Sequence, residues 1–316
     1  MFMGIRQRQS FPEMELEHHT LGNTGFKVSS IGMGCVTFGR EIDEATSFKV
    51  LDRALERGIN LFDTAAAYAA GASETVLGRW LAERRSRDQI ILASKVNGQL
   101  TRAHIRASVD ESLQRLQTDR IDLYQLHNWD SETPLEEILG TLSELQEAGK
   151  VRAIGCSNWM AWQLAKALLL ATRGGAPAIQ TVQPPYNLVQ REIEADLLPL
   201  CRDQNIGVIA YSPLAAGFLA GKYRRGQEVP KGTRFDVIPG HQPIYFTDRG
   251  YRVLECIDRV ASESGYSLVQ LALAWTLSRE NVCSVLIGAR NTAQVDQAFD
   301  ARDLNLSPEI LDSIGA

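Results

Sequence analysis

Residues 59–95 read INLFDTAAAYAAGASETVLGRWLAERRSRDQIILASK, and they contain two short apolar runs on either side of a helical pattern. The first run, INLFD, ends on Asp63, and the second, QIILASK, ends on Lys95. The segment between them has the spacing of a helix over residues 73–84. Short strands rich in Ile, Val and Leu that are joined through helices are typical of a parallel sheet buried on both faces.

The same arrangement recurs along the chain. Five further apolar runs end on polar or ionisable residues: IDLYQLH at His127, VRAIGCSN at Asn158, AIQTVQ at Gln183, IGVIAYS at Ser212 and VCSVLIGAR at Arg290. A first strand is expected at residues 29–34, SSIGMG. Helical patterns separate the runs at residues 43–58, 102–117, 134–149, 159–171 and 192–205. Eight strand–helix units fit, so the sequence predicts an α/β fold, the (β/α)8 TIM barrel, with its site at the carboxyl ends of the strands.

Two segments lie outside these units. Residues 18–30, HHTLGNTGFKVSS, predict a β-hairpin that turns at GNTG and plugs the bottom of the barrel. A long loop from Pro213 to about Asp248 follows the seventh strand and is rich in glycine, proline and basic residues. Such a loop is either a solvated surface excursion or a basic, glycine-hinged flap over an anionic ligand, and its place after a barrel strand favours the flap.

Composition agrees with one barrel domain over residues 18–316, preceded by an extension at residues 1–17 that we expect to be mobile. Of the 316 residues, 44% are hydrophobic and 22% are charged, which suits a globular core. The net charge of -5 argues against nucleic acid or an anionic membrane as a partner. No signal peptide or membrane span is visible, and the five cysteines show no metal-ligand spacing. We therefore expect a cytoplasmic protein with reduced cysteines and no metal site.

Four residues near the strand ends suggest chemistry. Asp63 and Tyr68 lie in FDTAAAY, Lys95 ends the next strand, and His127 ends the one after it. Taken separately, each has a structural explanation: the Asp could cap a helix, the Lys could be a solvated strand end, the Tyr could be a packing residue, and the His could be a satisfied core imidazole. Together they share one face of one barrel.

This combination suits the reduction of a carbonyl group. Tyr68 could donate a proton to the forming alkoxide, although a phenol with a pKa of about 10 does so reluctantly at neutral pH. Lys95 next to it would stabilise the phenolate and lower that pKa, while Asp63 would hold the ammonium group. His127 could donate a hydrogen bond to the carbonyl oxygen. None of the four supplies a hydride, so a cofactor must.

The chain resembles the aldo-keto reductase superfamily over nearly its whole length. The resemblance lies in LGNTGFKVSSIGMGCVTFG, FDTAAAYAAGASETVLG, IDLYQLHNWD, GKVRAIGCSNW, VQPPYNLVQRE, AYSPLAAGFLAGKY and IGAR, which occur in the family's order. It implies a (β/α)8 barrel that binds NADPH in extended form without a Rossmann domain. In agreement, no Gly-x-Gly-x-x-Gly fingerprint follows any expected strand.

The resemblance also implies roles for individual residues. Tyr68 becomes the proton donor, and Asp63, Lys95 and His127 complete the catalytic tetrad. The implied cofactor ligands fall into four groups: Ser157, Asn158 and Gln183 for the nicotinamide carboxamide; Tyr211 as the stacking aromatic; Ser212, Leu214, Gly217 and Lys222 for the pyrophosphate; and Gly288, Ala289, Arg290 and Gln294 for the adenosine end. The planar guanidinium group of Arg290 can bind a 2'-phosphate through two parallel hydrogen bonds. Many relatives carry an Asn where this chain has Ala298, which puts one adenine contact in doubt.

For the substrate pocket we expect Phe38, Trp129, Trp159 and Tyr245, each of which could instead be a structural aromatic. The predicted function is an NADPH-dependent oxidoreductase acting on aldehydes or ketones. A cofactor-binding accessory subunit of an ion channel, with little turnover, is the alternative. A barrel hydrolase or isomerase is disfavoured because no paired carboxylates or metal cluster accompany the tetrad. The sequence leaves the substrate, the direction of reaction and the oligomeric state open.

Overall fold

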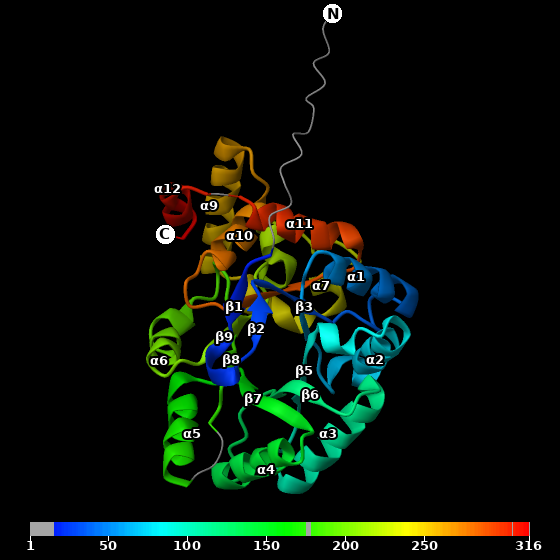
Figure 1. Ribbon diagram of the computed structural model, residues 1–316. Coiled ribbons are helices and arrows are strands. Elements are labelled where there is room, and N and C mark those ends of the chain that lie inside the picture. Colours follow the sequence, from blue (N-terminus) through cyan, green and yellow to red (C-terminus); the bar gives the residue numbers. More distant parts are fainter. Residues whose placement is uncertain (1–15, 175–177, 305, 316) are drawn as a thin grey trace, which may run out of the picture.

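The computed structural model describes residues 16–174, 178–304 and 306–315, in which eight parallel strands close into a barrel. The hydrogen-bonded order around it is β10, β3, β4, β5, β6, β7, β8, β9, so successive strands are neighbours (Figure 1). The strands are β3 (Ile31–Gly34), β4 (Leu61–Asp63), β5 (Ile91–Val96), β6 (Ile121–Leu126), β7 (Val151–Ser157), β8 (Thr181–Gln183), β9 (Gly207–Ala210) and β10 (Ser284–Gly288). The predicted (β/α)8 barrel is confirmed, and the carboxyl ends of its strands form one rim.

Helices alternate with the strands and surround the barrel (Figure 1). The main ones are α1 (Glu44–Glu56), α2 (Ala72–Arg84), α3 (Arg102–Leu116), α4 (Leu135–Glu147), α5 (Ala161–Gly174), α6 (Leu197–Asp203), α9 (Asp248–Ser264), α10 (Leu268–Leu277), α11 (Thr292–Arg302) and α12 (Pro308–Gly315). The predicted helix at 192–205 divides into the short turn η4 (Glu192–Glu194) and α6. Gly58 and Gly149 follow α1 and α4 with φ of 86° and 72°, a left-handed conformation that lets glycine end a helix without strain.

The predicted N-terminal hairpin is present and plugs the barrel. β1 (His18–Thr20) pairs antiparallel with β2 (Lys27–Ser29), and the turn η1 (Gly22–Thr24) lies between them. Leu21, Phe26 and Val28 of the hairpin pack against inward-facing strand residues, namely Leu61, Ala93, Leu123, Ala153, Ile209 and Leu286. Apolar side chains therefore fill this end of the barrel, which leaves the opposite rim for ligands.

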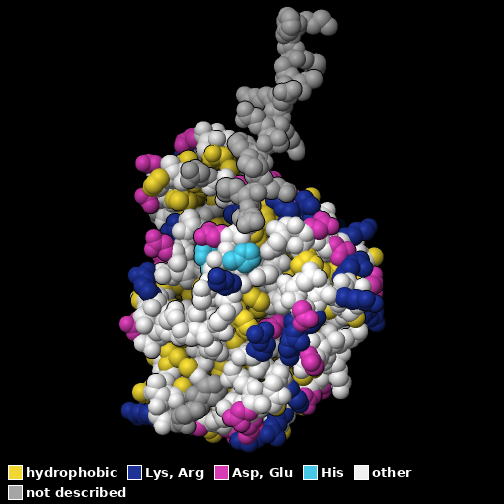
Figure 2. Space-filling model, in the orientation of Figure 1, with side chains coloured by type: hydrophobic (Ala, Val, Ile, Leu, Met, Phe, Trp, Pro, Cys, Tyr) yellow, Lys and Arg dark blue, Asp and Glu magenta, His cyan; other side chains and the backbone are white. Residues whose placement is uncertain are grey.

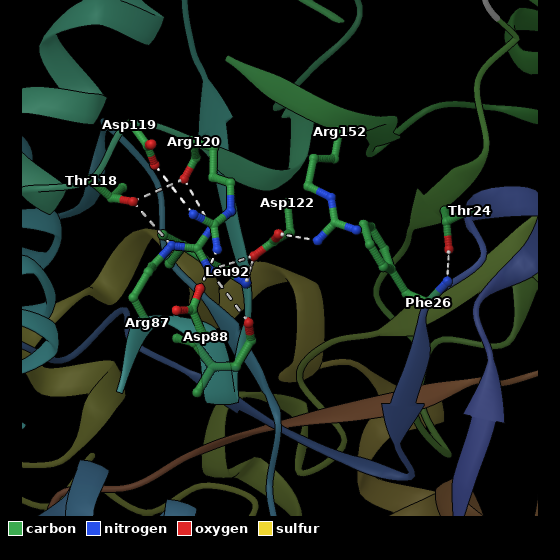
Figure 3. A network of polar contacts seen from close by, with 11 residues as sticks. Thr24, Phe26, Arg87, Asp88, Leu92, Thr118, Asp119, Arg120, Asp122 and Arg152 are labelled. Carbon is green, nitrogen blue, oxygen red and sulfur yellow. Dashed lines mark hydrogen bonds and ion pairs between the residues drawn. The ribbon is translucent and has the colours of Figure 1, made fainter. Parts of the chain in front are cut away.

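A buried carboxylate ties the hairpin end of the barrel together (Figure 3). Asp122 in β6 is 1% exposed, and it accepts a hydrogen bond from the backbone nitrogen of Leu92 at 2.9 Å. The guanidinium groups of Arg87 and Arg152 approach the same carboxylate at 2.8 and 3.0 Å. Arg152 also lies over the ring of Phe26, 4.7 Å from its centroid. Asp122 thus links β6 to β5, to β7 and to the turn before β5, and Arg152 extends the network to the hairpin.

The long loop that was predicted after the seventh strand follows β9. It contains η5 (Ala215–Ala220), α7 (Arg234–Val237), η6 (Pro239–His241) and α8 (Gln242–Tyr245). Six rings form an aromatic cluster there: Phe218, Tyr223, Phe235, Tyr245, Phe246 and Tyr251. These aromatic residues bury one another and give the loop a local core, which the glycine and proline content of the sequence does not indicate.

Several further expectations concern the chain as a whole. Most of the predicted extension, residues 1–15, lies outside the described residues. Within the part that is described, no helix is long and apolar enough to cross a membrane, and no group of three His, Cys, Asp or Glu side chains could hold a metal ion. All five cysteines are free in the structure. On the face shown in Figure 2, positive and negative side chains are interspersed, in keeping with the mixed charge of the sequence.

Candidate active site

The four residues of the predicted tetrad lie together at the rim. Asp63 ends β4, Lys95 lies near the end of β5, and His127 directly follows β6. Tyr68 begins the turn η2 (Tyr68–Gly71), which follows β4. Asp63 and Lys95 are buried, whereas Tyr68 and His127 are only partly buried. The charged pair is therefore hidden below two side chains that a ligand can reach.

The ammonium group of Lys95 has three acceptors, one for each of its N–H donors. Nζ donates to Oδ1 of Asp63 in an ion pair, to the carbonyl oxygen of Thr64 at 3.0 Å and to the Tyr68 hydroxyl at 3.3 Å. Burial is the largest single effect and lowers the pKa of Lys95, but the charges of Asp63 and Tyr68 and the hydrogen bonds to both together outweigh it, so the pKa lies above its ordinary value. Lys95 is thus a fixed cation in contact with the Tyr68 oxygen.

Opposing effects act on the pKa of Tyr68. Burial raises it, the charge of Lys95 lowers it, and the charge of Asp63 raises it again, so the pKa lies above its ordinary value. The expectation that Lys95 would lower this pKa is right for that one contact and wrong for the net shift, because desolvation is the larger effect. At neutral pH Tyr68 therefore carries its proton, and Lys95 is placed to stabilise the phenolate once the proton has left.

His127 is a neutral ring at neutral pH. Burial and the nearby charge of Lys95 lower its pKa to about 4. Its ring packs edge-on against Tyr68, with 5.7 Å between the centroids. Among the described residues, none is a hydrogen-bond partner for its buried Nδ1. A neutral imidazole has a single N–H, so His127 can orient a carbonyl oxygen but is not a cationic acid.

Two glutamine side chains hold the second oxygen of Asp63. Gln183 Nε2 donates to Oδ2 at 2.8 Å, and Gln125 Nε2 donates to the same atom at 3.2 Å. Gln125 was missed in the sequence, although it pairs with Lys95 across β5 and β6 and lies two residues before His127. Because alternate residues of a strand share a face, this polar position inside an apolar run could have been recognised.

A glycine makes room for Gln125 inside the barrel. A Cβ atom on Gly155 of β7 would lie 2.1 Å from the Thr181 hydroxyl and 3.2 Å from Cγ of Gln125. In the described part of the chain, neither Oε1 of Gln125 nor the Thr181 hydroxyl has a hydrogen-bond partner. Gly155 therefore admits a polar side chain below the tetrad that a larger residue would exclude.

The residues predicted to bind the carboxamide lie beside the tetrad in one hydrogen-bonded group. The Ser157 hydroxyl donates to the carbonyl oxygen of Gln183 at 2.7 Å. Asn158 has a φ of 59°, and its Nδ2 donates to the carbonyl oxygen of His127 at 3.0 Å. The Tyr211 hydroxyl donates to Oδ1 of Asn158 at 2.8 Å. Amide and hydroxyl groups of this kind can bind an amide, and the tyrosine face is close to them.

The segment predicted to bind the pyrophosphate has an unusual backbone. Five positions between Ser212 and Lys222 are left-handed: Ser212 (φ 55°), Ala215 (φ 50°), Ala216 (φ 56°), Gly217 (φ 90°) and Gly221 (φ 76°). Such a conformation costs a non-glycine residue about 1–3 kcal/mol and is concentrated at functional sites. Leu214 packs partly buried against the core. Lys222 is exposed, with no ion pair among the described residues, so its charge is available to an anion.

The residues predicted for the adenosine end follow β10. Gly288 is exposed, whereas Ala289 is buried, so Ala289 could offer a ligand only its backbone. Oε1 of Gln294 accepts a hydrogen bond from the backbone nitrogen of Arg290 at 2.7 Å, which leaves the amide nitrogen for a ligand. Ala298 is 2% exposed and packs in the core, so it provides no polar contact in place of asparagine.

Arg290 belongs to a cluster that the sequence did not reveal. Arg40, Arg234 and Arg290 surround the carboxylate of Glu41, and we call these four side chains the guanidinium cluster. Its members come from the loop after β3, from α7 and from the loop after β10. Residues so far apart in the chain give no local signal, although Arg234 lies in the basic segment that was predicted to contact an anion.

The predicted substrate-pocket residues are mostly enclosed. Phe38 is fully buried, and Trp159 and Tyr245 are 3% and 4% exposed. Trp129 is partly buried and packs edge-on against Trp159 at 4.8 Å and against the exposed Trp162 at 5.6 Å between centroids. The burial of the other three side chains supports a structural role, and of the four only Trp129 has substantial exposed surface. A cavity of about 760 Å³ between η4, α9 and α12 contains none of the predicted site residues.

Comparisons with known proteins agree with this geometry. Residues 30–316 match the model of the Aldo/keto reductase family. The chain is 37% identical to the aldo-keto reductase YhdN of Bacillus subtilis, with 93% of this chain and 91% of the relative covered. It is 35% identical to the uncharacterized oxidoreductase YrpG of the same organism, with 94% of each covered. A probable voltage-gated potassium channel subunit beta of Arabidopsis thaliana is 33% identical, with 95% of each covered.

Proposed function

Because the chain belongs to the aldo/keto reductase family, we propose that it reduces aldehydes or ketones with NADPH and that Tyr68 is the general acid. Family membership and the oxidoreductase relatives establish the broader class, an oxidoreductase that acts on carbonyl compounds. The observation that carries the finer proposal is the 3.3 Å hydrogen bond from Lys95 to the Tyr68 hydroxyl at a partly exposed point of the rim.

The side chains divide the work of carbonyl reduction. A bound nicotinamide would supply the hydride for the carbonyl carbon. Tyr68 gives its proton to the carbonyl oxygen, and the Lys95 ammonium group stabilises the phenolate that remains. Asp63 keeps Lys95 charged and in place, and the N–H of His127 holds the oxygen within reach of Tyr68. General acid catalysis of this kind contributes about 10² to 10⁴ in rate.

The donor groups support NADPH as the cofactor. Amide and hydroxyl groups of Ser157, Asn158 and Gln183 suit a carboxamide, and the exposed Lys222 suits a pyrophosphate. The guanidinium cluster contains three cations and one carboxylate, so it can accept a further anion such as the 2'-phosphate. These features support the assignment of Arg290 to the 2'-phosphate.

An accessory role without substantial turnover is the second candidate, because a relative is named as a probable channel subunit. The complete tetrad, with Lys95 in contact with Tyr68, favours catalysis. Steady-state NADPH consumption with a panel of aliphatic and aromatic aldehydes and ketones separates the two. Carbonyl-dependent turnover supports the enzyme. Tight NADPH binding without turnover on any member of the panel contradicts it and favours the accessory role.

A further inference from the structure

Glu41 lies at the centre of the guanidinium cluster and is almost enclosed. Its side chain is 7% exposed. Arg40 donates to both carboxylate oxygens, each at 2.7 Å, and Arg234 donates to Oε1 at 2.7 Å. Arg290 is less engaged, because its Nη2 lies 4.0 Å from Oε1. The carboxylate thus accepts hydrogen bonds from Arg40 and Arg234 and leaves the N–H groups of Arg290 available to a ligand.

The charges of the cluster do not balance. Three guanidinium groups remain protonated at any physiological pH, and Glu41 supplies one negative charge. The pKa of Glu41 lies below its ordinary value, because the surrounding arginines outweigh its burial. Burial and the charges of Arg234 and Arg40 lower the pKa of the neighbouring His241. At neutral pH the cluster therefore has a surplus of about two positive charges, close to the charge of a phosphate monoester dianion.

We propose that Glu41 is a specificity-determining residue that weakens the preference of this site for 2'-phosphorylated adenosine nucleotides. Its carboxylate competes with a phosphate for the N–H groups of Arg40 and Arg234 and repels the incoming dianion. This inference rests on the proposed function, in which Arg290 binds the 2'-phosphate. A nucleotide without the 2'-phosphate does not compete with the carboxylate for these N–H groups, so Glu41 does not weaken its binding. Glu41 therefore reduces the difference in affinity between NADPH and NADH.

The substitution Glu41→Gln separates the charge of the side chain from its shape. The amide keeps an oxygen that can accept from Arg40 and Arg234, while the negative charge is removed. A unit charge a few ångströms from a phosphate in a partly exposed site changes the interaction by at least about fivefold in affinity. We therefore expect the variant to bind the phosphorylated nucleotide more tightly and the unphosphorylated one with little change.

Isothermal titration calorimetry on the full chain tests this with adenosine 2',5'-bisphosphate and with adenosine 5'-monophosphate. Glu44→Gln is the matched control, because Glu44 of α1, whose side chain is 42% exposed, pairs with Arg79 at 2.7 Å outside the cluster. We expect Glu41→Gln to bind the bisphosphate at least about fivefold more tightly, and Glu44→Gln to behave as the unaltered chain. Circular dichroism checks the fold. If the glutamine variant does not fold, Glu41→Ala is measured with the same expected direction.

The outcomes separate this inference from the proposed function. Equal or weaker binding of the bisphosphate by a folded Glu41 variant, while Arg290→Ala weakens it, overturns the inference alone and makes Glu41 a clamp that holds the arginines. If the unaltered chain does not bind the bisphosphate, or if Arg290→Ala binds it equally well, the proposed phosphate site is wrong and the inference fails with it.

Discussion

The side-chain nitrogen of Gln183 lies 2.8 Å from Oδ2 of Asp63, while Oδ1 of the same carboxylate receives the Lys95 ammonium group. A carboxylate only accepts hydrogen bonds, so this contact turns the NH₂ group of Gln183 toward Asp63. The carbonyl oxygen of the Gln183 side chain is then left for a donor such as the amide of a carboxamide. The proposed cofactor site and the tetrad therefore share one hydrogen-bond network.

Gln125 completes this network, and its loss should slow catalysis. Gln125→Leu removes a donor from Oδ2 of Asp63 while nearly keeping the volume of the side chain. A hydrogen bond to a charged group is worth about 1.5–3 kcal/mol, so we expect kcat to fall by roughly tenfold or more. Steady-state kinetics with NADPH and an aldehyde measure the effect. Gln114→Leu, on the exposed face of α3, is the control. An unchanged kcat in a folded Gln125 variant would show that Gln183 and Lys95 suffice.

Tyr68→Phe should remove the proton donor and leave the ring in place. Since the hydroxyl contacts Lys95 at 3.3 Å, its loss also leaves that ammonium group with one acceptor fewer. We expect kcat to fall by at least about 10² while NADPH affinity, followed by fluorescence titration, stays similar. Tyr266→Phe, in the loop before α10, is the matched control. Near-normal turnover of Tyr68→Phe would assign the acid to another group.

His127 should make stability depend on pH. Its pKa is about 4 in the folded chain and about 6.5 when unfolded, so the unfolded chain takes up the proton first. The depressed value means that the folded chain loses stability as pH falls from about 6.5 through 4. In His127→Asn this contribution of His127 to the loss of stability at low pH should be absent. Melting temperatures of the two proteins at several pH values test it, because effects of the other groups cancel in the difference. A difference that does not vary with pH contradicts the low pKa.

The barrel could be predicted because each of its strands is indicated by a short stretch of neighbouring residues. Each buried parallel strand is a short apolar run, and Asp63, Lys95 and His127 each stand at or next to the end of one. The closing hairpin was also predictable from its turn. Closure then brings the strand ends to one rim without any knowledge of side-chain contacts. The tetrad therefore followed from the order of the motifs along the chain.

The features that were missed depend on contacts between distant segments. The ion pair of Glu41 with Arg234 joins the loop after β3 to a helix beyond β9, and nothing near either residue indicates it. The aromatic cluster after β9 is another case, because its rings are irregularly spaced and meet only in the folded segment. The net pKa of Tyr68 depends on how much water the fold removes, which a list of neighbouring charges does not give.

Arg290→Ala should change cofactor choice. A charge-assisted contact to the 2'-phosphate is worth about 1.5–3 kcal/mol, so NADPH affinity should fall roughly ten- to a hundredfold, with a much smaller effect on NADH. Lys222→Ala is the informative comparison, because a pyrophosphate is common to both cofactors and both affinities should fall together. Fluorescence titration with each cofactor measures this. Equal losses for NADPH and NADH in Arg290→Ala would remove the arginine from the 2'-phosphate site.

At the end of the barrel opposite the tetrad, Asp122 forms ion pairs with both Arg87 and Arg152 (Figure 3). Asp122→Ala leaves these two cations facing each other and the backbone nitrogen of Leu92 without its acceptor. Removing one partner of a buried ion pair costs about 3–5 kcal/mol, which urea denaturation can measure. Asp119→Ala is the control, since that exposed carboxylate pairs with Arg120 at 3.3 Å and such surface pairs are worth at most about 1 kcal/mol. At a temperature where the Asp122 variant remains folded, its kcat should match that of the unaltered chain, because the tetrad lies at the opposite end of the barrel, at the carboxyl ends of the strands. A loss of stability no larger than in the control would show that the network contributes little.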